Sequence, residues 1–199
     1  MRLNRCQLKI ELLCRGLDLG GRLHQIARTR AGLGSGLEAM IPGSPPMAVN
    51  IPVLESFAHK SPFHLLSEEP GGKFQDRRTG ESYPLELREE PLWYGKTTTR
   101  GVPMGRVGTL QGTYLGLYVA ESCGFWRDNL QCRFCTTGLN VGRDQDTVKH
   151  VSDVVETCLE AKASSGATFF HLNAGYLHGR ELETLLPYVE AIKRDVGGL

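Results

Sequence analysis

The 199-residue sequence lacks several features that would assign a protein to a broad class. It has no apolar run of about 18 residues, the length that a membrane-spanning helix needs. Its 23 Lys and Arg balance 22 Asp and Glu, so no basic excess favours a broad nucleic-acid surface. The N-terminal stretch carries charges throughout and has no small-residue cleavage site, which argues against a secretory signal. We therefore expect a soluble cytoplasmic protein without a membrane partner.

Cysteines are few, but half of them are crowded together. Of the six, Cys123, Cys132 and Cys135 fall in one short segment, ESCGFWRDNLQCRFCTTG. Without an export signal, crowded cysteines are more often metal ligands or redox groups than disulfides. Cys158 lies on the apolar face of a predicted helix and is expected in the core. The two cysteines near the N-terminus are expected to be ordinary thiols.

Residues 1–110 predict an accessory segment of irregular composition. Loose helical spacing of leucines over 8–28 indicates a helix, and the Gly-, Ser- and Pro-rich stretch 31–46 reads as a linker. From residue 49 onward, short alternating runs divided by Pro and Gly predict small strands. A turn signal at 78–80 favours a hairpin there.

Residues 111–199 show a clearer alternation. The apolar run 112–120 suits a strand buried on both faces, and 167–173 predicts a second strand. An amphipathic helix, capped by Asp146 or Thr147, is expected between them, and another follows the second strand. This order predicts parallel strands with right-handed crossovers, the pattern of an α/β enzyme. Two such units leave an open edge, so we expect a truncated chain.

The spacing of the three cysteines favours a catalytic metal centre. A Cys-x-x-Cys turn at Cys132 and Cys135 would point both sulfurs at one centre, and Cys123 supplies a third ligand. Thiolates are soft ligands that favour zinc, copper(I) and iron–sulfur clusters. A closed structural site uses four ligands, whereas three would leave one iron open for a substrate or cofactor. The loop also follows a predicted strand, where catalytic groups gather in α/β folds.

The segment from 112 to 199 resembles the radical S-adenosylmethionine (radical SAM) superfamily. Cys132-Arg133-Phe134-Cys135 has the Cys-x-aromatic-Cys ending of that superfamily's loop, although the gap of eight residues after Cys123 is longer than in most members. The resemblance extends to an uncharacterised radical SAM group encoded beside nitrilases. It implies the first strand–helix units of a partial, TIM-like (β/α) barrel.

The resemblance also implies cofactors and partners. A 4Fe–4S cluster held by the three cysteines would bind S-adenosyl-L-methionine at its open iron and cleave it reductively, so that a 5′-deoxyadenosyl radical takes a hydrogen atom from an unknown substrate. The electron would come from a donor such as flavodoxin or ferredoxin. Phe134 would lie near the adenine. Asn173, Ala174 and Gly175 occupy the place of the stretch that meets the cofactor's amino group.

Two other interpretations compete with a radical SAM enzyme. The cysteines could form a non-catalytic zinc-binding module, with His150 or His171 as fourth ligand, although their spacing fits no standard zinc finger. They could also hold a cluster that only carries electrons, although no fourth cysteine lies nearby. A lone strand histidine such as His171 is more often a core residue than a functional one.

Overall fold

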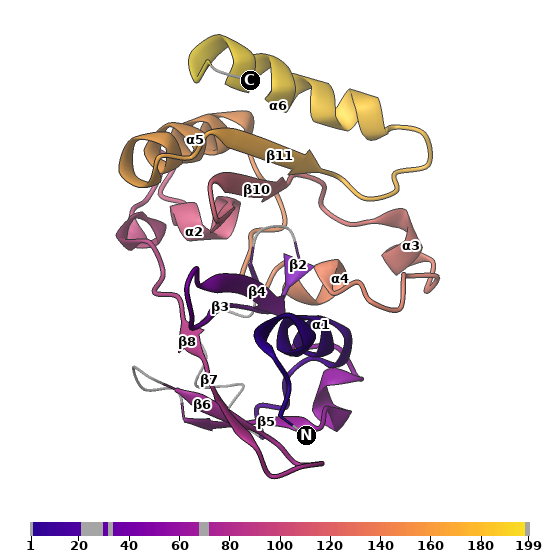
Figure 1. Ribbon diagram of the computed structural model, residues 1–199. Coiled ribbons are helices and arrows are strands. Elements are labelled where there is room, and N and C mark those ends of the chain that lie inside the picture. The colour runs from indigo at the N-terminus through magenta and orange to yellow at the C-terminus, as the bar shows by residue number, and fades with distance from the viewer. Residues whose placement is uncertain (1, 21–29, 32–33, 68–71, 198–199) are drawn as a thin grey trace. The chain divides into compact units, whose positions relative to one another are not determined.

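The computed structural model describes residues 2–20, 30–31, 34–67 and 72–197 (Figure 1). The chain divides into two compact units, one formed by Met1–Ala31 with Ser35–Glu89 and one by Gly32–Gly34 with Glu90–Leu199. Residues 90–110, which the sequence grouped with the accessory segment, therefore pack with the second unit. Part of the helix expected over 8–28 lies outside the described residues.

The first unit contains one helix and small antiparallel sheets. The elements up to residue 89 are α1 (Arg5–Arg15), β1 (Arg30–Ala31), β2 (Gly34–Ser35), β3 (Leu37–Ile41), β4 (Met47–Ile51), the 3₁₀ turn η2 (Ala58–Lys60), β5 (Phe63–Ser67), β6 (Lys73–Asp76), β7 (Ser82–Pro84) and β8 (Glu86–Leu87). Helix α1 begins after Asn4, whose side chain accepts a hydrogen bond from the backbone of Gln7 while the Gln7 side chain accepts from Asn4. Leu8 and Leu12 then face the core of this unit.

Two three-stranded sheets complete the first unit, in the orders β4-β3-β8 and β5-β6-β7. The hairpin predicted around residues 78–80 is confirmed, because β6 and β7 pair antiparallel on either side of it. The linker predicted over 31–46 is wrong for Leu37–Ile41, which forms the central strand β3. Its alternating burial shows why: Leu37, Ala39 and Ile41 face the core, and the surrounding glycines and prolines lie outside the strand.

The second unit carries the cysteines. Its elements are the 3₁₀ turn η3 (Leu92–Gly95), α2 (Met104–Val107), β9 (Thr109–Gln111), β10 (Tyr114–Tyr118), α3 (Gly124–Arg127), α4 (Thr137–Asn140), α5 (Val151–Ser165), β11 (Phe169–Asn173) and α6 (Glu181–Asp195). Strands β10 and β11 pair in parallel through the crossover helix α5, and α6 packs on α5 (Figure 1). Strand β10 is buried on both faces, as the apolar run predicted.

The partial TIM-like barrel predicted from the sequence is wrong. The sheet has the order β11-β10-β9, and β9 pairs with β10 antiparallel, whereas a (β/α) barrel consists of parallel strands. Gln111 lies opposite Tyr114, so the intervening Gly112 and Thr113 form a tight hairpin loop rather than the start of a long strand. The fold is therefore mixed α/β with several small sheets.

Helix α5 begins later than the capping residues suggested. Its N-cap is His150, not Asp146 or Thr147, and it ends at Ser165, with Gly166 in the left-handed C-cap conformation. Cys158 on its inner face is fully buried, which confirms the core position predicted for it.

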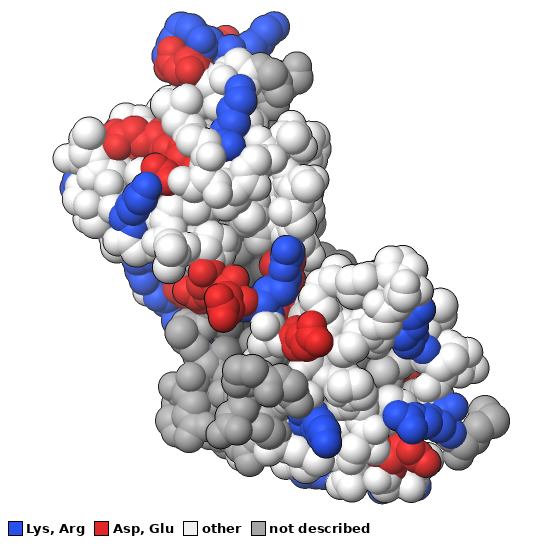
Figure 2. Space-filling model, turned by 60° about the vertical axis from the view of Figure 1, so that its left-hand side comes forward, with Lys and Arg blue, Asp and Glu red and all other residues white. Residues whose placement is uncertain are grey.

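Charge is spread rather than concentrated on the face that Figure 2 shows. Basic and acidic side chains alternate there, so that face presents no continuous basic patch. Among the residues that the structure describes, no helix has both the length and the apolar character needed to cross a membrane.

The segment before β9 is tied to α5 by a buried carboxylate. Asp153 is only 1% exposed, and its Oδ1 accepts a hydrogen bond from Thr98 Oγ1 at 2.7 Å. Arg100 Nε lies 3.3 Å from the other carboxylate oxygen. Because Thr98 is also buried, its hydroxyl would lose its hydrogen-bond acceptor if the carboxylate were removed.

We predict that Asp153→Ala lowers the free energy of unfolding by about 2–4 kcal/mol, because it leaves a buried hydroxyl and a guanidinium without their acceptor. Urea denaturation followed by circular dichroism measures the change. Asp195→Ala is the control. It removes an exposed carboxylate that pairs with Arg194 and should leave the urea concentration at the midpoint of unfolding unchanged. An Asp153→Ala midpoint equal to that of the wild type would contradict the prediction.

Candidate functional site

The three cysteines lie on the segment that follows β10, here called the cysteine loop (residues 121–136). This segment is joined to the residues that follow β11. Val119 N donates to Asn173 O at 2.9 Å, which continues the parallel ladder, and Gly124 N donates to Tyr176 O at 2.6 Å. Because parallel strands end at the same edge of a sheet, the cysteine loop and residues 173–178 lie together there.

Cys123 is held by the loop that follows β11. The backbone N–H of Tyr176 donates to Cys123 Sγ at 3.4 Å. Gly175, with a φ of +66°, lies directly against this cysteine: a Cβ at residue 175 would lie 3.1 Å from Cys123 Sγ and 3.2 Å from the Tyr118 hydroxyl. Only glycine therefore allows the two loops to approach this closely. Asn173 supports the turn, because its side-chain oxygen accepts the N–H of Gly175 at 2.8 Å.

Cys135 is held from within the cysteine loop and from α4. The indole N–H of Trp126 donates to Cys135 Sγ at 3.3 Å. The thiol lies 3.4 Å from Thr137 Oγ1, to which it donates. The Trp126 ring packs on Gly138, where a Cβ would approach the ring to 2.4 Å. Cys135 thus has a defined position, although it lies nine positions after Trp126 in the sequence.

Tyr118, the last residue of β10, places a phenol beside both of these cysteines. Its side chain is 97% buried, and its hydroxyl has no hydrogen-bond partner among the described residues. Burial raises the pKa of Tyr118 well above its usual value, and the neighbouring Cys123 and Cys135 raise it further. The phenol is therefore protonated at neutral pH and retains a donor hydrogen.

Cys132 is separate from the other two. It is exposed and begins a turn in which Cys135 N donates to Cys132 O at 3.0 Å, so the Cys-x-x-Cys turn predicted from the sequence is present. Across the part of the chain that the structure describes, no three Cys, His, Asp or Glu side chains are close enough together to hold a metal ion. The structure thus places Cys123 and Cys135 near enough to Tyr118 to raise its pKa, and leaves Cys132 exposed.

Two features of the cysteine loop bear on whether three thiolates could hold a cluster here. Two sulfurs already accept N–H hydrogen bonds, from the Tyr176 backbone and the Trp126 indole, and bonds of this kind support cysteines that ligate iron–sulfur clusters. All residues from 127 to 134 are exposed, so an approach of Cys132 would uncover no core. Phe134 in this turn is 76% exposed, which leaves the aromatic ring available to a bound molecule.

The other predicted site residues lie in different settings. Ala174 is 2% exposed and packs in a small cluster with Tyr118. His171 is exposed on β11, near the rings of Tyr114 and Phe169, so the core position expected for it is wrong. His150 caps α5 and is also exposed.

Two residues of the site, Tyr118 and Trp126, were not recognised in the sequence, and the role of Tyr176 was not foreseen. In the sequence, Tyr118 is part of an apolar run that predicts a buried strand. Only its position just before the cysteine loop indicates that it could lie near the cysteines. Trp126 lies three residues after Cys123, yet its indole bonds to Cys135. Tyr176 acts through its backbone N–H, which no side-chain pattern can reveal.

The comparisons with known proteins do not assign this site. No protein-family model matches the chain, and no curated protein or solved structure matches it either. The chemistry of the cysteine loop is therefore argued from its own residues.

We predict that Tyr118→Phe leaves the free energy of unfolding of the metal-free protein unchanged or raises it by up to about 1 kcal/mol. The substitution removes a buried hydroxyl that has no partner, and it keeps the ring that fills the space. Thermal and urea unfolding of both proteins give the comparison. A loss of stability above about 1 kcal/mol would show that the hydroxyl is bonded in the metal-free protein.

Proposed function

We propose that this chain is a radical SAM enzyme that binds a 4Fe–4S cluster through Cys123, Cys132 and Cys135. The observation that carries the proposal is the setting of two of these thiols. Both Cys123 and Cys135 raise the pKa of one buried phenol, that of Tyr118, and each sulfur accepts an N–H from a different residue of the fold. A buried core would not need such donors around sulfur, whereas thiolates that carry a cluster do.

The chain's own residues would position the cluster and its co-substrate. When bound, the cluster would supply the electron that cleaves S-adenosyl-L-methionine reductively. The backbone of Tyr176, the indole of Trp126 and the hydroxyl of Tyr118 would donate toward the thiolates and compensate part of their negative charge. The protein would take its electron from a donor such as flavodoxin or ferredoxin, and a reducing cytoplasm would suit such a centre.

The loop after β11 offers acceptors for the amino group of S-adenosyl-L-methionine. The carbonyl of Asn173 accepts from Val119, and that of Tyr176 accepts from Gly124. We therefore expect the carbonyls of Ala174 and Gly175, rather than the Asn173 side chain, to meet the amino group. Phe134 would cover the adenine with its exposed ring.

We predict that anaerobic reconstitution with iron and sulfide gives a brown protein with broad visible absorption, iron and acid-labile sulfide. Cys123→Ala, Cys132→Ala and Cys135→Ala should each lower cluster affinity at least about tenfold, because each removes one ligand. Iron and sulfide analysis after desalting measures the loss.

Two substitutions serve as controls for cluster binding. Cys14→Ala removes an exposed thiol of the first unit, and Cys158→Ala removes a buried thiol whose pKa burial raises to about 12. Both proteins should keep the cluster. Loss of the cluster in Cys158→Ala that is folded by circular dichroism would overturn the ligand set. Stoichiometric zinc in the purified protein, without iron or sulfide uptake, would favour the zinc-binding module instead.

We predict that S-adenosyl-L-methionine changes the EPR spectrum of the reduced cluster, because three thiolates leave one iron without a protein ligand. Incubation with reductant should also release 5′-deoxyadenosine, measured by chromatography. S-Adenosyl-L-homocysteine, which lacks the sulfonium, should yield no 5′-deoxyadenosine. An unchanged spectrum with no cleavage product would identify the protein as an electron carrier.

A further inference from the structure

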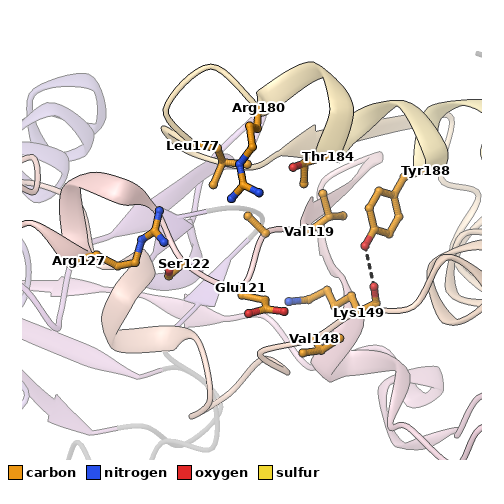
Figure 3. Close-up of a pocket in the computed structure, with 11 residues that line it drawn as sticks. Val119, Glu121, Ser122, Arg127, Val148, Lys149, Leu177, Arg180, Thr184 and Tyr188 are labelled. Atoms are coloured by element: carbon orange, nitrogen blue, oxygen red, sulfur yellow. Dashed lines mark hydrogen bonds between the residues drawn. The ribbon is translucent and has the colours of Figure 1, made fainter.

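A second feature of the same unit is a cavity of about 320 Å³ beside the cysteine loop (Figure 3). Small-molecule sites in proteins begin at about this volume, which greatly exceeds that of a single inorganic ion. Its lining comes from three parts of the chain: the residues that follow β10, those that precede α5, and the start of α6. The cavity is lined by Val119, Ala120, Glu121, Ser122, Arg127, Val148, Lys149, Leu177, Arg180, Thr184 and Tyr188.

The charges that line this cavity are mainly positive. Arg127 ends α3 and Arg180 is the N-cap of α6, and Figure 3 shows both guanidinium groups extending toward the same hollow. Within the described ranges, neither guanidinium forms an ion pair with a carboxylate. Lys149 is the third cation. Its ammonium group donates to Asp146 O at 2.6 Å.

One carboxylate, that of Glu121, balances part of this charge. In Figure 3 the Glu121 carboxylate and the Lys149 ammonium point toward one another. Glu121 also lies close enough to Tyr188 to raise the pKa of that phenol, although burial is the larger cause. The Tyr188 hydroxyl donates to Lys149 O at 2.7 Å and so closes one side of the cavity. Among the residues that the structure describes, no carboxylate forms an ion pair with the guanidinium of Arg127 or Arg180.

The remaining groups indicate what kind of anion would fit. Two guanidinium forks from different elements can bond several oxygens of one group from two directions. A phosphomonoester carries about two negative charges at neutral pH and three terminal oxygens, so it matches both arginines, whereas one carboxylate would leave an arginine unmatched. The hydroxyls of Ser122 and Thr184 add further donors, and Val119, Val148 and Leu177 supply an apolar wall for an organic part.

We propose that this cavity binds a small phosphomonoester, with its phosphate between Arg127 and Arg180. The proposal does not depend on the iron–sulfur cluster, because every residue that carries it is in place in the metal-free chain. The ligand would lie beside the cysteine loop, since Arg127 follows Cys123 in the same short helical turn. It would thus be bound near the place where the proposed cofactor reacts.

Isothermal titration calorimetry and thermal unfolding of the full metal-free chain, at constant ionic strength, test this assignment. Ribose 5-phosphate is the probe, ribose lacks the phosphate, and succinate offers carboxylates instead. We expect ribose 5-phosphate to bind and to raise the unfolding temperature, and ribose and succinate to have no effect. Arg127→Gln and Arg180→Gln should each weaken binding at least about tenfold.

Arg194→Gln is the matched control, because it removes an arginine from the far end of α6 that pairs with Asp195. It should bind ribose 5-phosphate like the wild type. The unfolding temperatures of all three variants without ligand show whether each is folded. Equal weakening by Arg194→Gln, unchanged binding in both cavity variants, or tighter binding of succinate than of ribose 5-phosphate would overturn the proposal. If the metal-free chain binds ribose 5-phosphate but cluster reconstitution fails, the cavity proposal is supported and the proposed function is not.

Discussion

The site depends on two reciprocal hydrogen bonds between the loops that follow β10 and β11. Gly124 N donates to Tyr176 O, and Tyr176 N donates to Cys123 Sγ. Together they fix one sulfur at the edge of a parallel strand pair, and they require Gly175 to have no side chain. Cys135 is held independently by Trp126, and both Cys123 and Cys135 are near enough to the buried Tyr118 to raise its pKa. This arrangement needs only two parallel strands, not a barrel.

The difference between a single pair of parallel strands and a barrel also shows how much of the fold could be predicted from the sequence. The apolar run of β10 and the amphipathic pattern of α5 are local signals in the sequence. Both elements are present, and each buries its apolar residues. The direction of β9 depended on two residues, Gly112 and Thr113, which turn the chain back by hairpin geometry. In the sequence, Gly112 and Thr113 were interpreted as the beginning of the strand that became β10. Only parallel neighbours were therefore expected for that strand. Strand β3 was missed because the glycines and prolines around it outweighed five alternating residues.

The site was predictable only where sequence spacing determines geometry. The Cys-x-x-Cys turn formed because residues three apart meet in a single turn. The hydrogen-bond donors to the two sulfur atoms could not be predicted from sequence spacing. The Trp126 indole reaches Cys135 across the loop, and the Tyr176 backbone reaches Cys123 across fifty-three positions of the chain. No motif marks the cavity arginines either, because Arg127 and Arg180 are far apart in the sequence and line one cavity only in the folded chain.

Arg127 links the two sites through electrostatics as well as through the chain. It is the one cation that lowers the pKa of Tyr118, against the larger opposing effects of burial and the cysteines. Arg127 therefore belongs both to the surroundings of the Tyr118 phenol and to the lining of the cavity, so an anion bound there would lie next to the cysteine loop.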